Sequence, residues 1–266
     1  MNRNITVRIL VFLNTLTFIG MVTVNSLANI LPINGVRTAD VSGSLTNLLV
    51  PDGLTFLIWI VIYLALFISI VYQWIIVRFE DKERYIKVYG PYLIFSNILN
   101  GLWILSWHYY IITLSLVVML LLLYFLSILH SRIHEIAGPL SFNICVRFPI
   151  SLYYGWVTIA TVANITSLLV SLGWNPGEQV STLWAIPVLI LAAIVNILVA
   201  LHRKDIWFPL VGIWGIMGIY RKRMSVPGEE SSLIALAALV CSCAIGITII
   251  ITLIIKRRQI AREGYH

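Results

Sequence analysis

Three tryptophans lie inside long apolar stretches of the sequence, where each indole N–H needs an acceptor. They are Trp59, Trp103 and Trp156. Hydrocarbon offers no acceptor, so a polar partner must come from the protein or from a bound molecule. Flat rings with a few polar groups are typical of pockets for large planar apolar ligands. Packing of aromatic stripes between helices explains the same residues and stays open as the alternative.

Helical spacing of about 100° per residue places further rings and amides on the same faces. Tyr63 follows Trp59 on a stripe that is expected to continue to Phe67 and Trp74, and Asn100 precedes Trp103. A third face carries Tyr153, Trp156, Ala160 and Asn164. From the helix rise, Trp156 lies about 12 Å from the end of its helix at Arg147. Trp59 and Trp103 belong to the opposite half of the membrane, so a shared pocket is expected to be tall.

The composition identifies the apolar stretches as membrane spans. The chain has 266 residues, of which 60% are hydrophobic and 11% charged, whereas soluble proteins carry about a quarter charged residues. Continuous apolar runs exclude barrel strands, which alternate. The sequence predicts an all-α polytopic transmembrane bundle of eight spans. Its expected spans are residues 9–31, 54–77, 91–107, 111–129, 148–172, 183–201, 206–220 and 233–255. Seven spans are the alternative, because the segment 206–220 is short, contains Pro209 and three glycines, and would also suit a re-entrant segment.

Basic residues lie in short clusters between the spans, although the net charge is +7. With eight spans, fourteen of the 18 Lys and Arg share the side of the N-terminus, and Arg37 and Arg221–Arg223 lie on the other side. The positive-inside rule then predicts a cytosolic N-terminus. We expect a multi-pass protein of the plasma membrane, in contact with the lipid bilayer and without a nucleic-acid partner. Trp74, Trp107, Trp184 and Trp207 near span ends are assigned to the interfacial belt.

Catalytic machinery is not visible in the sequence. No ionisable side chain lies in the middle of a span, which disfavours proton relays and ion-coupled pumps. We therefore predict that the protein is not an enzyme, with no metal site and no obligatory cofactor. His130 and His134 have a spacing that zinc could use, but their position favours solvated interfacial residues. His108 is interpreted as an interfacial hydrogen-bonding residue rather than a haem ligand.

Asp52 and three cysteines have structural interpretations. Asp52 follows Pro51 at the start of a span, where a carboxylate caps free backbone N–H groups; gating of a pocket entrance is the alternative. Cys145, Cys241 and Cys243 make an odd count in apolar surroundings, so a disulfide framework is not expected.

Three motifs, in order, resemble the TspO/MBR family of tryptophan-rich sensory, translocator-protein-like membrane proteins. They are the stretch Pro51-Asp52-Gly53 through Trp59 and Tyr63, the Asn100-x-x-Trp103 pair, and Trp156-x-x-x-Ala160-x-x-x-Asn164. The resemblance covers about residues 9–172, which is five spans, the family's helix count. It implies a five-helix core at residues 1–172, followed by additional C-terminal transmembrane helices at 173–266. The chain then resembles a longer, divergent member of the family.

The resemblance also implies a pocket for porphyrins and other bulky apolar molecules. By similarity Trp59, Asn100, Trp103, Trp156 and Ala160 line it, and the aromatic and polar faces add Tyr63, Tyr153 and Asn164. A tetrapyrrole, porphyrin or haem-like molecule is thus the candidate ligand of a sensor (receptor) or carrier. A facilitative transporter or permease of a small apolar solute is a second hypothesis, and an accessory subunit of a membrane complex a third.

Small residues recur on the last span. Ala238, Ser242 and Gly246 form a row that lets helices approach closely. Packing within the chain is favoured over a homodimer, which stays open as the alternative.

Overall fold

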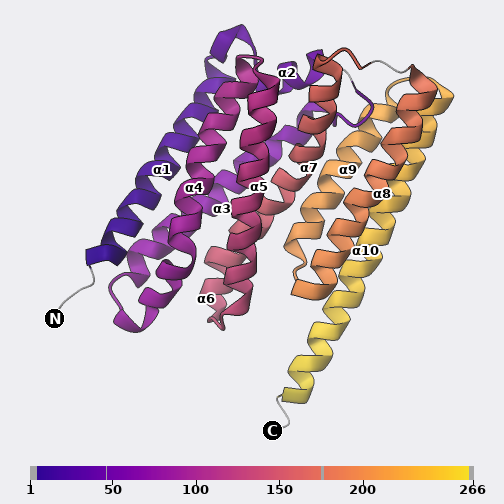
Figure 1. Cartoon of the computed structure of the whole chain (residues 1–266). Coiled ribbons are helices and arrows are strands. Elements are labelled where there is room, and N and C mark those ends of the chain that lie inside the picture. The colour runs from indigo at the N-terminus through magenta and orange to yellow at the C-terminus, as the bar shows by residue number, and fades with distance from the viewer. Residues whose placement is uncertain (1–4, 46, 175–176, 264–266) are drawn as a thin grey trace. The chain divides into compact units, whose positions relative to one another are not determined.

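The computed structural model describes residues 5–45, 47–174 and 177–263, and every regular element in these ranges is helical (Figure 1). The long helices are α1 (Ile5–Ile30), α3 (Ile58–Ile76), α4 (Glu83–His108), α5 (Ile112–Glu135), α7 (Phe148–Ser171), α8 (Glu178–Arg203), α9 (Trp207–Met224) and α10 (Glu229–Glu263). Shorter elements are η1 (Ile33–Gly35), α2 (Thr38–Ser44), η2 (Gly53–Leu57), η3 (Glu80–Lys82), α6 (Leu140–Phe142) and the π-helical η4 (Asn143–Arg147).

Seven helical stretches among the described residues are long and apolar enough to cross a membrane. They are Ile5–Ile30, Gly53–Ile76, Glu80–His108, Ile112–Glu135, Leu140–Ser171, Gln179–Arg203 and Glu229–Gln259. The predicted all-α polytopic bundle is therefore confirmed. The number of such helices among the described residues is seven, which was the alternative to the eight predicted spans. The segment that falls short is α9, whose 18 residues include three cations in the last turn.

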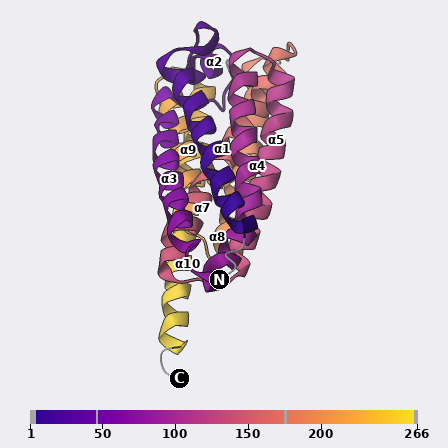
Figure 2. The same cartoon turned by 90° about the vertical axis from the view of Figure 1, so that its left-hand side faces the viewer.

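The chain divides into two compact units, and the first comprises the described residues of 1–45 and 58–157. In this unit α4 packs against α5 and α1, and α1 also contacts α3. Figure 2 shows α1 between α3 and α4. Amides join these helices: Asn14 donates to Gln73 of α3 at 3.0 Å, and Asn25 donates to Asn100 of α4 at 2.8 Å. Both amides therefore face a neighbouring helix.

The second unit comprises the described residues of 46–57 and 158–266. Here α10 packs against α8 and α9, and α9 also contacts α8 and η2. With 35 residues, α10 extends past the ends of α8 and α9 (Figure 1). Ala238 and Ser242 of the small-residue row are buried within the unit, as packing within the chain requires, while a Cβ at Gly246 would meet open space. The predicted domain boundary at residue 172 stays a prediction.

Two helices begin earlier than the sequence indicated. α4 starts at Glu83 and contains Pro91 in its interior, although Pro91 was expected to open the span. The helix that carries Trp156 is preceded by α6 and η4, so its membrane segment begins at Leu140 instead of Phe148. Trp156 therefore lies sixteen residues, roughly 24 Å of helix rise, from that beginning. The estimate that set Trp156 at another depth than Trp59 was wrong for this reason.

Arg147 lies inside this longer segment and donates hydrogen bonds to the C-terminal end of α5. Its Nε donates to the carbonyl of Ile133 at 2.9 Å, and Nη1 donates to the Asn143 side chain at 2.6 Å. Carbonyls in the last turn of a helix have no partner in that helix, and a guanidinium is well suited to bind them. From the sequence Arg147 was assigned to the loop before the helix of Trp156, because hydropathy does not reveal its hydrogen bonds to the end of α5.

The glycines of α9 are contact positions and leave the helix unbroken. A Cβ on Gly212 would overlap the amide of Asn196 on α8, and a Cβ on Gly215 would lie 2.8 Å from Cγ2 of Ile159. A Cβ on Gly218 would overlap the Thr55 hydroxyl. The three glycines thus allow close approach of three neighbouring segments.

Asp52 connects the loop before α3 with the last turn of α9 in the second unit. Its Oδ2 accepts Nε of Arg221 at 2.7 Å, and its Oδ1 accepts Nη2 at 3.1 Å and the backbone N–H of Thr55 at 3.1 Å. The Thr55 hydroxyl also donates to this carboxylate. Trp214 donates from Nε1 to the Thr55 carbonyl at 2.9 Å, and the Arg221 guanidinium lies over its ring. We call Asp52, Thr55, Trp214 and Arg221 the clamp.

The clamp confirms the capping role of Asp52 and bears on the topology. The N-terminal end of α9 lies near Lys204, which donates to Gln259 of α10 at 2.7 Å, while its C-terminal end reaches Asp52. An 18-residue helix rises about 27 Å, close to the hydrocarbon thickness. Within this unit α9 thus runs from Lys204 to Asp52, and its crossing of the membrane as an eighth span stays a prediction.

Candidate ligand-binding site

A cluster of aromatic rings surrounds Trp59 in the first unit. The Trp59 ring stacks on Tyr63 at a centroid distance of 5.4 Å and lies 6.0 Å from Trp103. It meets Tyr153 at 6.1 Å and Trp156 at 6.2 Å, both edge to face. We call these five residues the aromatic cluster. Helices α3, α4 and α7 supply its rings, as the three predicted faces require.

Buried hydrogen bonds position the helices that carry the cluster. The Asn25–Asn100 bond joins α1 to α4 one turn before Trp103. The Tyr153 hydroxyl donates to the backbone carbonyl of Ser96 at 3.3 Å, which fixes α7 against α4. Asn100 thus holds the backbone next to the rings. Sequence reasoning missed Asn25 as its partner, although the placement of Asn25 in an apolar stretch was a signal that it faces another helix.

The Tyr63 hydroxyl and Nε1 of Trp103 are buried in the cluster without a hydrogen-bond partner among the described residues. A buried donor without an acceptor costs about 1–3 kcal/mol, so native structures seldom keep one without a reason. Both atoms can donate to a bound molecule. The site is therefore apolar and aromatic, with two donors free to orient an acceptor.

The end of α4 is covered by the segment between α1 and α2. Nε1 of Trp107 donates to the Thr38 carbonyl at 3.2 Å, and the Asn34 amide donates to the His108 carbonyl at 3.0 Å. The His108 ring lies within hydrogen-bond distance of the Thr38 hydroxyl, at 3.1 Å, and of the Ile33 carbonyl, at 3.3 Å. This confirms His108 as a hydrogen-bonding residue, with both ring nitrogens engaged.

Trp107 belongs with the rings and not with the interfacial belt. It is 4% exposed and stacks on Trp103 at 6.2 Å, so its assignment to the belt was wrong. Its N–H finds an acceptor because residues 31–44 fold back onto the helix end, which span counting does not reveal. Trp74, Trp184 and Trp207 are between 41% and 61% exposed, as belt residues should be.

The remaining predicted residues lie apart from the cluster in different ways. Phe67 is 54% exposed and Trp74 45%. Phe67 lies eight residues after Trp59 and Trp74 fifteen. At about 100° per residue their side chains point roughly 60–80° away from the direction of Trp59, so they lie off the face of the helix that carries the cluster. Ala160 and Asn164 follow Trp156 on α7, in the part that belongs to the second unit. Ala160 is half-buried and Asn164 is buried. Their place in the pocket stays a prediction.

The sequence matches the family model described as TSPO-like protein over residues 11–251. The chain belongs to this TSPO-like family. The match runs from α1 into α10, so it extends beyond the five spans in which the motifs lie. Comparisons with curated proteins and with solved structures gave no match. In this TSPO-like chain, the aromatic cluster brings together Trp59, Trp103 and Trp156, one tryptophan from each of the three sequence motifs.

Proposed function

We propose that this TSPO-like membrane protein binds bulky, planar, apolar molecules of the tetrapyrrole type at the aromatic cluster and acts as a sensor or carrier for them. The observation that carries the proposal is that rings from three motif-bearing helices converge on Trp59. Their flat faces match a conjugated macrocycle, and the free donors of Tyr63 and Trp103 match its polar substituents. The resemblance of the motifs to the TspO/MBR family implies the same ligand class, and the chain's membership of the TSPO-like family is consistent with that resemblance.

Ligand entry requires the rings to part, because they contact one another in the structure. Each aromatic pair contributes about 0.5–1.5 kcal/mol, so separating the four pairs around Trp59 costs roughly 2–6 kcal/mol. A macrocycle offsets this cost by stacking on the same rings and by accepting hydrogen bonds from the Tyr63 hydroxyl and the Trp103 N–H. Smaller apolar molecules offer fewer contacts, which favours large planar ligands.

Fluorescence quenching by protoporphyrin tests the proposal on the detergent-purified protein. The half-saturation concentration is the quantity to compare, because removing a tryptophan changes the quenching amplitude by itself. Trp156→Ala should raise it at least tenfold, while Trp156→Phe, which keeps an aromatic face, should raise it less. Ala160→Phe, which fills the space predicted beside the rings, should also weaken binding.

The matched control is Trp184→Ala, because Trp184 is 61% exposed on α8. It should bind as the unaltered protein does. Equal half-saturation in all variants would contradict the proposed site. Protoporphyrin flux across liposomes that contain the protein would favour the transporter hypothesis over sensing, and a stoichiometric partner without binding would favour the accessory subunit.

A further inference from the structure

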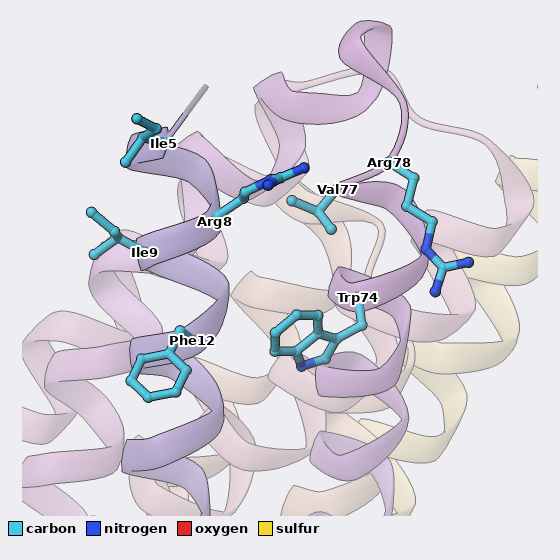
Figure 3. A pocket seen from close by; sticks show the side chains of 7 residues that line it. All are labelled: Ile5, Arg8, Ile9, Phe12, Trp74, Val77 and Arg78. Carbon is cyan, nitrogen blue, oxygen red and sulfur yellow. The ribbon is translucent and has the colours of Figure 1, made fainter. Parts of the chain in front are cut away.

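A groove of about 500 Å³ opens between the N-terminal part of α1 and the end of α3, within the first unit (Figure 3). Its lining is apolar except at the mouth. The residues that line it are Ile5, Arg8, Ile9, Phe12, Trp74, Val77 and Arg78. This groove is separate from the aromatic cluster, since none of the five cluster residues lines it.

The Trp74 ring forms a wall of the groove and is held in place. Its Nε1 donates to the Thr15 hydroxyl of α1 at 3.0 Å, and in Figure 3 the ring points from α3 toward α1. Ile9 and Phe12 are more than half exposed, so side chains of the described residues do not cover them. In a membrane protein such an apolar surface at a span end faces acyl chains.

Two arginines stand at the mouth and have no anionic partner among the described residues. Arg8 reaches from α1 toward Val77, and Arg78 follows the end of α3 (Figure 3). Both are exposed, and neither side chain makes an ion pair or hydrogen bond within the described residues. The acids nearest in sequence to Arg78 are balanced by an equal number of bases: Glu80, Asp81 and Glu83 against Lys82, Arg84 and Lys87. The groove mouth therefore keeps a positive charge.

We propose that this groove binds one anionic phospholipid. An acyl chain lies along Ile9, Phe12 and Trp74, and the phosphate lies at the mouth, where Arg8 donates to it and Arg78 adds charge. The complementarity of apolar floor and unpaired guanidinium groups singles out an anionic lipid, because a zwitterionic head group brings its own cation to the same place.

Native mass spectrometry of the detergent-solubilised protein tests this with two lipids, phosphatidylglycerol and phosphatidylcholine of the same acyl chains. We expect one adduct with a preference for phosphatidylglycerol. Each basic residue at a membrane surface favours an anionic lipid by roughly fivefold. Arg8→Gln and Arg78→Gln should thus each lower the preference about fivefold, and the double variant more than tenfold. Ile9→Trp, which fills the groove, should remove the adduct with either lipid.

The control is Arg257→Gln with Arg258→Gln on α10, which removes the same charge from exposed positions outside the groove. It should keep the preference for phosphatidylglycerol. Equal binding of both lipids by the unaltered protein, or an equal loss in control and groove variants, would overturn the proposal. Because the side chains of Arg8 and Arg78 have no partner in the part of the chain that the structure describes, their variants should keep the thermal stability of the unaltered protein.

Discussion

Asp52→Asn removes the charge of the clamp and keeps its shape. An asparagine oxygen can still accept the N–H and hydroxyl of Thr55, so the cap of η2 survives. What is lost is the ionic part of the two bonds from Arg221. We therefore expect this variant to separate the ion pair from the cap, and to loosen the attachment of α9 to the loop before α3.

The expected magnitude follows from exposure. The Asp52 side chain is 21% exposed and that of Arg221 39%, so solvent screens the pair despite its bidentate geometry. Pairs of this kind contribute about 0.2–1 kcal/mol. Asp52→Ala also removes the cap, which adds about 1 kcal/mol. The order of stability should thus be the unaltered protein, then the asparagine variant, then the alanine variant.

The assay is the free energy of unfolding in mixed micelles, measured for Asp52→Asn, Arg221→Gln and both together. The double variant should lose less than the sum of the single variants by about 0.2–1 kcal/mol, the coupling between the two side chains. Additive losses would show that the ion pair does not form and would contradict its role in attaching α9 to the loop before α3. The affinity for protoporphyrin should not change; a loss of affinity at unchanged stability would favour the gating hypothesis for Asp52.

Three further predictions concern the pH dependence of the clamp, two glycines of the second unit, and the amide bond between α1 and α4. Arg221 holds the pKa of Asp52 below its ordinary value near 3.8. The stability that the pair contributes should therefore be complete above about pH 4 and decline as the pH falls through the lowered pKa. Melting temperatures of the unaltered protein and of Asp52→Asn, measured as a function of pH, check this. Parallel curves for the two proteins would contradict it. Gly218→Ala should destabilise the protein by about 1–3 kcal/mol because the added Cβ overlaps Thr55 of the clamp, whereas Gly246→Ala should be neutral or stabilising by up to about 1 kcal/mol. Thermal unfolding of the two variants tests this, and equal changes in melting temperature would contradict it. Asn25→Ala should lower the free energy of unfolding by about 1–2 kcal/mol, because it leaves the side-chain carbonyl of Asn100 buried without its donor. Asn100→Ala should lower it less, since Asn25 keeps a hydrogen bond within its own helix. The reverse order in unfolding measurements would contradict this pairing.

Much of the fold could be predicted from hydropathy because each span is an apolar run long enough for a bilayer. Helix ends could not. α4 begins eight residues before Pro91, and the α7 segment begins at Leu140. In both cases polar residues continue the helix beyond the apolar run, and a contact such as that of Arg147 with the carbonyls of α5 makes this favourable.

The candidate site was predictable in its rings and not in its partners. Helical spacing brought Trp59, Trp103 and Trp156 to inward faces, and their rings do meet. The hydrogen bond between Asn25 and Asn100 could not be foreseen, because spacing gives the face of a residue on its own helix and not the neighbour across from it. For the same reason the glycines of α9 suggested a broken helix until their neighbours were known.

Pairing between loops was the least predictable part. Asp52 and Arg221 are separated by 169 residues, and each had a local explanation in the sequence, as a cap and as part of a basic cluster. Only the packing of α9 against the loop before α3 brings them together.

Photo-crosslinking with an apolar diazirine-bearing porphyrin, followed by peptide mass spectrometry, tests directly whether a porphyrin binds at the aromatic cluster. We expect labelling of α3, α4 and α7 next to Trp59, Trp103 and Trp156. Excess protoporphyrin should suppress this labelling, and Trp156→Ala should reduce it while Trp184→Ala should not. Labelling spread over the lipid-facing surfaces, without competition by protoporphyrin, would contradict it.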